Sequence, residues 1–410
     1  MTNPITTAST TSTATAASGS TSKRQKLADQ SNQDSLLPGL PDHIAQLCLS
    51  LVHPSLLYSV CRSWRRLIYS PSFPPFLSLY ALLLPTQTAH HHSDSDSIEF
   101  FSFDPISSKW YSLPPLPPYP PLHILLRHPS FISRNLPIQS VAVSGNLVLL
   151  AATTHHFIPA LPRPLIFSTL SQKWAFGPPL ATPRRWCVTG ASRAAVYVAS
   201  GVGSRYSLEV ARSVEKWDLQ KNHCHHYHNN NKTSRGWNWE KMGGLRDGKF
   251  SRDAIDAIGW RRRLCMVNVK GNAAKEGVVY DIEKDSWEEM PDGMLAGWRG
   301  PAAAMDEDTI YVVDESKGAL RRYDPDNDGW VEILESERLR GAEHMVAAGG
   351  RVCVVCGGGD GIVAVDVVAL PPKLWVVDTP PGYQAIAVHI LPRISLPDFQ
   401  PPVLTSTSMK

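Results

Sequence analysis

The feature that most constrains this chain is a strand-like unit that recurs from about residue 100 onward. Each unit has an apolar strand ending near an Asp, a short turn and a strand with a Trp. A loop and a strand of small residues follow. The first half occurs as FFSFDPISSKWYSLPP at 100–115, PLIFSTLSQKWAFGPP at 164–179, VVYDIEKDSWEEMP at 278–291 and RRYDPDNDGWVEIL at 321–334. Self-similarity of this kind indicates a repeat architecture.

The spacing of the tryptophans gives the size of the unit. The equivalent positions are Trp110, Trp174, Trp239, Trp287, Trp330 and finally Trp375 or Leu374. A period near ~45 residues, stretched by insertions, is the span of one four-stranded blade. The sequence therefore predicts a mainly β fold, a six-bladed β-propeller. A propeller of five or seven blades is an alternative, because the unit that begins at 362 is degenerate.

Small-residue segments such as 302–304 and 347–350 are expected to form the crowded innermost strands. The segment SLYALLLP at 78–85 has no small-residue strand before it, and YQAIAVHIL at 383–391 has no unit after it. We therefore expect the C-terminal strand to become the innermost strand of the first blade, which removes the open edges of the ring.

Several details of the unit resemble the kelch repeat. They are Tyr-Asp-Pro at 323–325, a Trp six residues after the Asp in several units, and glycine clusters at 349–350 and 357–359. The resemblance implies a kelch-type propeller over residues 76–392.

Residues 36–75 differ in composition from the repeats, because they are rich in Leu, Val and Ile. Asp42 can cap a helix whose apolar residues Ile44, Leu47, Cys48 and Leu51 share one face. A second helical stripe contains Leu56, Leu57, Val60, Trp64 and Leu67. Short helices in so few residues cannot build an independent core, so this segment is expected to pack against a partner or a neighbouring domain.

The order of residues in this segment resembles an F-box of the plant F-box/kelch-repeat type. Leu40-Pro41-Asp42 is followed by Ile44, Leu49, a Pro-Ser-Leu-Leu turn at 54–57 and Val60-Cys61-Arg62-Ser63-Trp64-Arg65-Arg66-Leu67. The resemblance implies binding to a SKP1-type adaptor and, through it, to the cullin of a ubiquitin ligase. The positions implied to contact the adaptor are Leu40, Pro41, Ile44, Leu49, Leu57, Val60 and Trp64. For Trp64 a place in the core of the module is the competing interpretation.

In a ligase of this kind the propeller would select the protein to be ubiquitinated, whose identity the sequence does not reveal. The F-box enters the first blade at the start of its second strand, so target binding is expected on the opposite rim. Arginines, aromatic residues and a histidine recur there: Arg184, Arg185, Trp186, Arg252, Trp298, Arg299, Arg340 and His344. Arg and Trp are frequent interaction anchors. Alternatively, the arginines tie neighbouring blades together.

Composition excludes other classes of protein. The net charge is +3 and the basic residues are scattered, so nucleic acid is not an implied partner. No window holds the roughly 18 apolar residues of a membrane span. Seven cysteines without an N-terminal signal favour an intracellular location, in the cytoplasm or the nucleus. The Ser/Thr-rich residues 1–35 are expected to be disordered, and residues 393–410 to be a flexible tail.

Two motifs suggest metal chemistry. HCHHYHNNNK at 223–232 is too compressed for a zinc site and is interpreted as a flexible insertion. Cys353 and Cys356 lie three apart on a strand and so point to opposite faces, which favours structural thiols. No catalytic, cofactor or metal motif is recognisable, so we expect a non-catalytic receptor subunit. The alternatives are a kelch scaffold without ligase function and a propeller enzyme.

Overall fold

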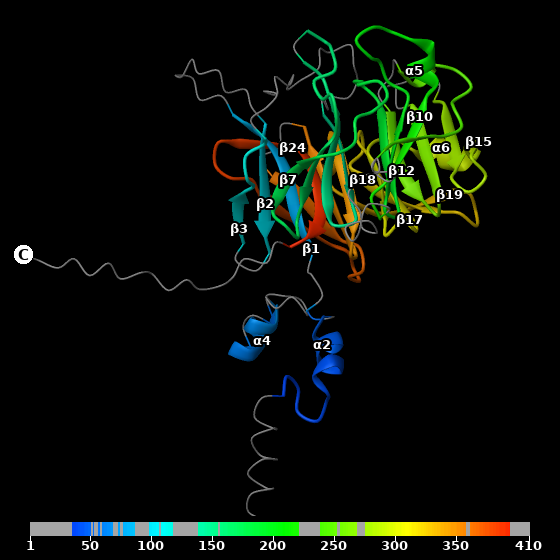
Figure 1. Ribbon diagram of the computed structural model, residues 1–410. Coiled ribbons are helices and arrows are strands. Elements are labelled where there is room, and N and C mark those ends of the chain that lie inside the picture. The colour runs from blue at the N-terminus through cyan, green and yellow to red at the C-terminus, as the bar shows by residue number, and fades with distance from the viewer. Residues whose placement is uncertain are drawn as a thin grey trace, which may run out of the picture. The chain divides into compact units, whose positions relative to one another are not determined.

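The computed structural model describes residues 35–50, 52, 56–57, 60–68, 73, 77–86, 98–105, 108–117, 138–154, 156–220, 238–251, 255–268, 275–357 and 361–393 (Figure 1). The chain divides between Pro74 and Pro75 into a helical unit and a propeller unit. Arg252, the His-rich segment at 223–232, and residues 1–34 and 394–410 of the two tails lie outside the described residues. Among the residues described, no helix is long and apolar enough to span a membrane.

The propeller unit contains six four-stranded antiparallel sheets, which confirms the six blades predicted from the tryptophan spacing. Blade one consists of β24 (Tyr383–Pro392), β1 (Leu77–Pro85), β2 (Glu99–Asp104) and β3 (Lys109–Ser112). Blade two is β4 (Ile138–Val143), β5 (Asn146–Ala152), β6 (Leu165–Ser168) and β7 (Lys173–Phe176). Blade three is β8 (Val188–Ser192), β9 (Ala195–Ala199), β10 (Val214–Asp218) and β11 (Glu240–Lys241).

The other three blades follow in chain order. Blade four is β12 (Ile255–Trp260), β13 (Arg263–Asn268), β14 (Gly277–Asp281) and β15 (Ser286–Glu289). Blade five is β16 (Ala302–Met305), β17 (Thr309–Asp314), β18 (Ala319–Asp324) and β19 (Gly329–Glu335). Blade six is β20 (Ala342–Ala348), β21 (Arg351–Cys356), β22 (Gly361–Asp366) and β23 (Lys373–Asp378). Short helices α5 (Leu208–Arg212), α6 (Asp292–Gly297), η2 (Lys249–Ser251) and η3 (Glu337–Leu339) lie in the connections.

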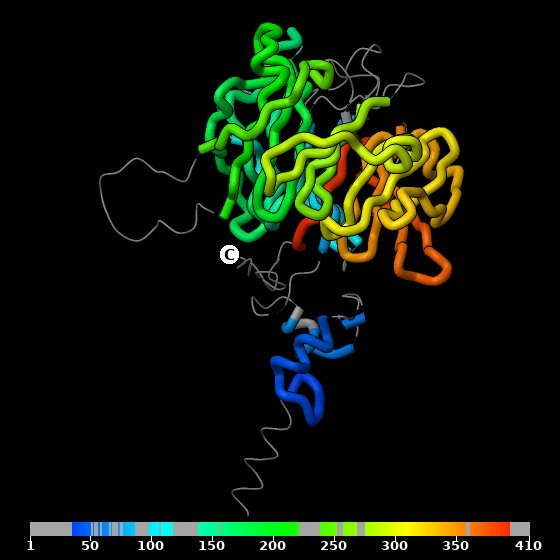
Figure 2. Tube along the Cα trace, turned by 90° about the vertical axis from the view of Figure 1, so that its right-hand side faces the viewer, coloured from blue at the N-terminus to red at the C-terminus, as the bar shows by residue number. Residues whose placement is uncertain are grey.

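The innermost strands contact one another around a ring in the order β24, β4, β8, β12, β16, β20 and back to β24. Figure 2 shows from the side how the later blades, coloured from green to orange, follow one another in chain order. Space near the axis is limited, as the small residues of these strands predict. At Gly259 of β12, an added Cβ would overlap the carbonyl oxygen of Ala191 in the preceding blade. Layers of apolar side chains fill the space between successive blades, for example Leu147 and Phe167 of blade two against Tyr80 of blade one.

The C-terminal strand completes the first blade. β24 pairs with β1 from Leu77↔Pro392 to Pro85↔Tyr383. The hydroxyl of Tyr80 donates to the Pro392 carbonyl at 2.7 Å, and Arg393 pairs with Asp104 at 2.6 Å. We call the edge at which the six innermost strands begin the start rim, and the opposite edge the end rim. The first residue of β1 pairs with the last of β24, so the chain enters the propeller at the end rim.

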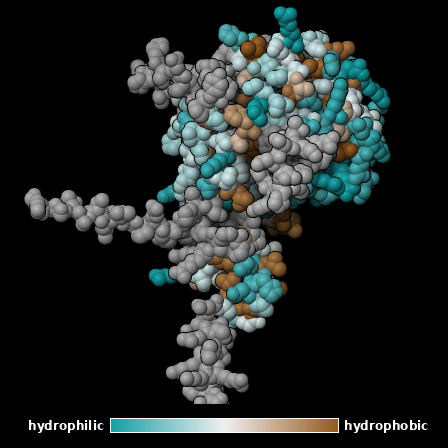
Figure 3. All heavy atoms as spheres, in the orientation of Figure 1, coloured by the Kyte–Doolittle hydropathy of each residue, from teal (hydrophilic) through white to brown (hydrophobic). Residues whose placement is uncertain are grey.

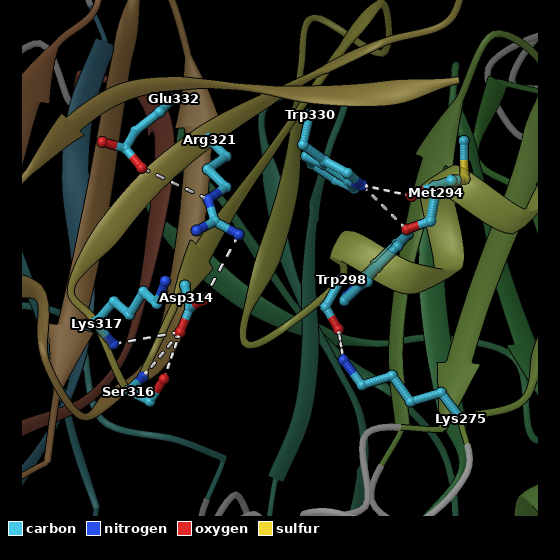
Figure 4. Close-up of polar contacts among 10 residues, drawn as sticks. Lys275, Met294, Trp298, Asp314, Ser316, Lys317, Arg321, Trp330 and Glu332 are labelled. Atoms are coloured by element: carbon cyan, nitrogen blue, oxygen red, sulfur yellow. Dashed lines mark hydrogen bonds and ion pairs between the residues drawn. The ribbon is translucent and has the colours of Figure 1, made fainter. Parts of the chain in front are cut away.

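The repeated tryptophans join each blade to the one before it. The indole Nε1 donates to a backbone carbonyl at the end of the preceding blade in five of the six units, at Trp110→Asp378, Trp174→Pro114, Trp239→Pro178, Trp287→Gly243 and Trp330→Gly293. Figure 4 shows the last of these, where the Trp330 indole also reaches the Met294 carbonyl at 3.2 Å. The tryptophans of the outer strands therefore form hydrogen bonds between blades in addition to filling space.

In the helical unit, α2 (Asp42–Ser50) and α4 (Arg62–Ile68) are the described helices. The sequence predicted that Asp42 caps the first helix. Instead, the Asp42 carboxylate accepts a hydrogen bond from the Leu36 amide at 3.2 Å. It therefore folds the preceding turn back onto the helix start.

Candidate interaction surfaces

The helical unit exposes large apolar side chains. Ile44 is 37% exposed, Leu47 59% and Val60 57%, and Leu40 and Leu56 are exposed as well. Figure 3 shows hydrophobic residues gathered on this unit. The apolar stripe of Ile44, Leu47 and Cys48 thus lies on the outward face of α2, while Ala45 and Leu49 form its buried face. A surface of this composition is typical of interaction sites.

The residues predicted to contact the adaptor fall into two groups. Leu40, Pro41, Ile44 and Val60 are exposed, and the buried Leu49 and Leu57 lie in the core of the unit. Trp64 is half-buried, and its indole donates to the Leu36 carbonyl at 2.8 Å. It ties the N-terminal turn to α4, which favours the interpretation of Trp64 as a core residue of the module.

Arg184, near the start rim, is not accessible to a target protein, contrary to the expectation from the sequence. Its side chain is 1% exposed and pairs with the buried carboxylate of Glu215. It also donates to the Ser200 carbonyl at 3.1 Å and the Ser213 hydroxyl at 2.7 Å. Arg184 therefore holds together the interior of blade three, rather than contacting a target or tying two neighbouring blades together.

Trp298 is likewise not accessible to a target protein. Its indole is fully buried in the core between blades four and five, and its carbonyl accepts a hydrogen bond from Lys275 (Figure 4). Its neighbour Arg299 is exposed. Arg340 is exposed too, with an ion pair to Glu337 at 3.0 Å and a hydrogen bond to the Lys317 carbonyl at 3.3 Å. Arg252 stays a prediction.

The remaining predicted residues, Arg185, Trp186 and His344, line one central cavity of about 950 Å³. Its walls are the innermost strands, including Thr189–Ala191 of β8 and Ala302–Ala304 of β16. Sequence reasoning missed other polar residues of the lining, among them Ser140, Arg205, Tyr206 and His389. Arg205 and Tyr206 lie in the connection from β9 to β10, which also reaches the start rim.

A histidine pair lies in the wall where the ring closes. His389 of β24 is 2% exposed, and its Nε2 is 2.9 Å from the Ser140 hydroxyl of β4. His344 of β20 accepts a hydrogen bond from the Val388 amide at 3.3 Å, and the two imidazole rings are 5.7 Å apart. Burial, followed by the charge of His344, lowers the pKa of His389 to about 3. His389 is therefore neutral in the native protein near neutral pH.

Cys353 and Cys356, the cysteine pair singled out from the sequence, are weakly reactive thiols. Burial raises the pKa of Cys353 to about 12 and that of Cys356 to about 11, and both thiols are free. The Cys356 thiol donates to the Arg338 carbonyl at 3.2 Å. A thiol with a raised pKa is a poor nucleophile and a poor metal ligand. Across the described part of the chain, no group of three or more His, Cys, Asp or Glu residues could hold a metal ion.

The fold and the helical unit define a class of protein: a β-propeller preceded by a small helical module with an exposed apolar face. Comparison with known proteins gives the family. The chain is 51% identical over 391 residues, 94% of its length, to the F-box/kelch-repeat protein SKIP25 of Arabidopsis thaliana, of which the match covers 96%. It therefore belongs to the F-box/kelch-repeat proteins. No protein-family model matches the chain.

Two more distant relatives agree. The F-box protein AFR of Arabidopsis thaliana is 24% identical over 79% of this chain and 82% of its own length. The F-box/kelch-repeat protein SKIP4 of the same plant is 36% identical over 70 residues, which is 17% of this chain and 19% of that protein. Family membership and the propeller fold together support a substrate-receptor role in general terms.

Proposed function

We propose that the chain is the substrate-recognition subunit of a SKP1-cullin-F-box ubiquitin ligase, acting in the cytoplasm or the nucleus. The helical unit binds a SKP1-type adaptor and, through it, cullin, and the propeller binds the protein to be ubiquitinated. The chain itself contributes binding and no catalysis. The observation that carries the proposal is the exposure of the apolar side chains of Ile44, Leu47 and Val60 in a unit with an F-box sequence.

Exposure of the apolar side chains of the helical unit to water is energetically unfavourable. Within its described residues this unit buries few side chains, and five of its large apolar residues remain more than a third exposed: Leu40, Ile44, Leu47, Leu56 and Val60. Complete burial of a fully exposed Leu, Ile or Val side chain is worth about 1.5–3 kcal/mol, and completing the burial of each of these partly exposed side chains contributes a fraction of that. An adaptor with a complementary apolar groove would bury several at once. The exposed face is therefore a binding surface, and Leu49 and Leu57 support it from beneath.

The test is a binding measurement with a recombinant SKP1-type adaptor. The variant Ile44→Glu/Val60→Glu places two charges on the apolar face, and we expect at least about tenfold weaker binding. His43→Glu is the matched control because His43 is exposed on the same helix and outside the predicted contact set. It should bind like the wild type. Deletion of residues 36–75 should also abolish copurification of cullin. Unchanged adaptor binding by the double variant would refute the proposal.

For the propeller, we propose that the target binds at the start rim. Arg299 and Arg340 are exposed there, and Arg185, Trp186 and His344 surround the mouth of the cavity. Charge reversal at Arg299 and Arg340 should weaken capture of the target by a chain that lacks residues 36–75, with no change in thermal stability. Loss of stability in step with loss of capture would favour a structural role instead.

A further inference from the structure

The central cavity has the size and lining of a small-molecule site. Pockets for such ligands usually measure about 300–1,000 Å³ and combine apolar walls with a few polar groups. This cavity, of about 950 Å³, is walled largely by short side chains such as Ala302–Ala304, Val346–Ala348 and Thr189–Ala191. These walls present apolar surface to the cavity, and an apolar ligand would remove that surface from water.

Arg185 is an incompletely satisfied cation in the lining. Its guanidinium stacks on the Trp186 ring at 4.5 Å and donates from Nη1 to the Gly203 carbonyl at 2.7 Å. Its Nε is buried and has no hydrogen-bond partner, and within the described residues Arg185 forms no ion pair. Burial lowers its pKa. A partly desolvated guanidinium with a free donor is stabilised most by a carboxylate, the group its geometry fits.

The backbone holds this arrangement in an uncommon conformation. Trp186 has φ +54° and Phe157 has φ +55°, both in the left-handed region, and their rings lie 6.4 Å apart. Bulky residues seldom occupy that region, and each such residue costs on the order of 1–3 kcal/mol. Two backbone hydrogen bonds of 2.9 Å between Arg185 and Val202 fix the segment. Strain of this kind is retained mainly where a ligand or partner is bound.

The charged residues that line the cavity differ between its two ends. Arg185 and Arg205 lie toward the start rim, and neither forms an ion pair among the described residues. Asp306 and Glu307 lie in the turn after β16, at the end rim, where Glu307 accepts hydrogen bonds from the Ser192 hydroxyl and the Arg193 amide. Glu343, which is exposed near the start of β20, pairs with neither arginine. The start-rim half of the cavity therefore favours an anionic group.

We propose that the start-rim half of the central cavity binds a small organic acid with an apolar body. Its carboxylate pairs with Arg185, and its body packs on the small-residue walls. The inference goes beyond the ligase role and stands even if adaptor binding fails. A bound acid would fill the mouth of the cavity beneath the proposed target surface, so it would become part of what the target contacts.

The experiment is calorimetric titration of the full-length protein with 2-naphthoate and with 2-naphthamide, which has the same body without the charge. We expect saturable binding of the acid, at least about tenfold tighter than that of the amide. Arg185→Gln should remove this preference, and Arg185→Lys should keep part of it. Arg299→Gln is the matched control, because Arg299 is on the same rim and does not line the cavity.

Three results would overturn the inference. The first is no saturable binding of the acid, and the second is equal binding of the acid and the amide. The third is an unchanged preference in Arg185→Gln. A blocked acidic dipeptide, N-acetyl-Asp-Phe-amide, tests whether the carboxylate comes from a protein segment rather than from a small organic acid. Arg185-dependent binding of the peptide without binding of 2-naphthoate would assign the site to a segment of the target protein.

Discussion

The indole nitrogen of Trp110 donates a 2.7 Å hydrogen bond to the backbone carbonyl of Asp378, which lies 268 residues further along the chain. Trp110 is in the outermost strand of blade one, and Asp378 ends the outermost strand of blade six. The bond therefore spans the junction at which the ring closes, at the periphery, while β24 closes it near the axis. Because it repeats the contact made by four other tryptophans, closure uses the same interaction as the other blade junctions.

Replacing Trp110 by Phe should destabilise the propeller by about 1–2 kcal/mol, because it deletes this hydrogen bond and part of the packing on Phe103, whose ring is 5.2 Å away. Urea denaturation measures the loss. Trp375→Phe is the control, because Trp375 occupies the equivalent strand of blade six and has no such bond among the described residues. Equal losses in the two variants would show that the hydrogen bond contributes nothing.

Repetition explains which parts of the fold were predictable. Each tryptophan unit is weak alone, but their common spacing located the outer strands and hence the six blades. A single position has no such support. Nothing local distinguishes Arg184, which is buried on Glu215, from Arg185, which lines the cavity. In α2, apolar residues occur on both faces, so periodicity could not say that Ile44 points outward. The partners that decide these positions are distant in sequence.

Replacing Gly293 by Ala should destabilise the propeller by about 2 kcal/mol or more, although Gly293 lies in the helix α6, where Ala is intrinsically favoured by ~1 kcal/mol. The added Cβ would overlap the carbonyl oxygen of Asp328. The Gly293 amide also donates to the Asp328 carboxylate at 2.8 Å. Gly329→Ala is the control, since its new Cβ would have no neighbour closer than 3.7 Å. A stabilising effect of Gly293→Ala in thermal denaturation would contradict this close approach.

Replacing Arg184 by Met should cost about 3–5 kcal/mol of unfolding free energy, because it leaves the buried carboxylate of Glu215 without its counter-charge. The double variant Arg184→Met/Glu215→Leu should recover most of the loss, since it removes both charges. Arg299→Met, at an exposed arginine of the same rim, should change stability by less than about 0.5 kcal/mol. If the single and double variants were equally unstable in urea, the pairing would not be the cause.

Protonation of His389 should make the propeller less stable in mild acid. Burial holds the pKa of His389 at about 3 in the folded protein, below its value of ~6.5 in an unfolded chain. Between these two values the unfolded state binds one more proton than the native state, so stability falls as the pH drops below ~6.5. The loss approaches about 1.4 kcal/mol per pH unit, or about 2 kcal/mol between pH 7 and pH 5.

The variant His389→Asn removes the titrating group and keeps a polar side chain opposite the Ser140 hydroxyl. It should be less stable than the wild type at pH 7, but its unfolding free energy should fall by about 2 kcal/mol less between pH 7 and pH 5. Urea denaturation at a series of pH values measures this difference. His156→Gln replaces an exposed histidine of the same unit and should follow the wild-type profile. Parallel profiles for His389→Asn and the wild type would mean that His389 is charged in the native wall, and that the Ser140 contact tolerates the proton.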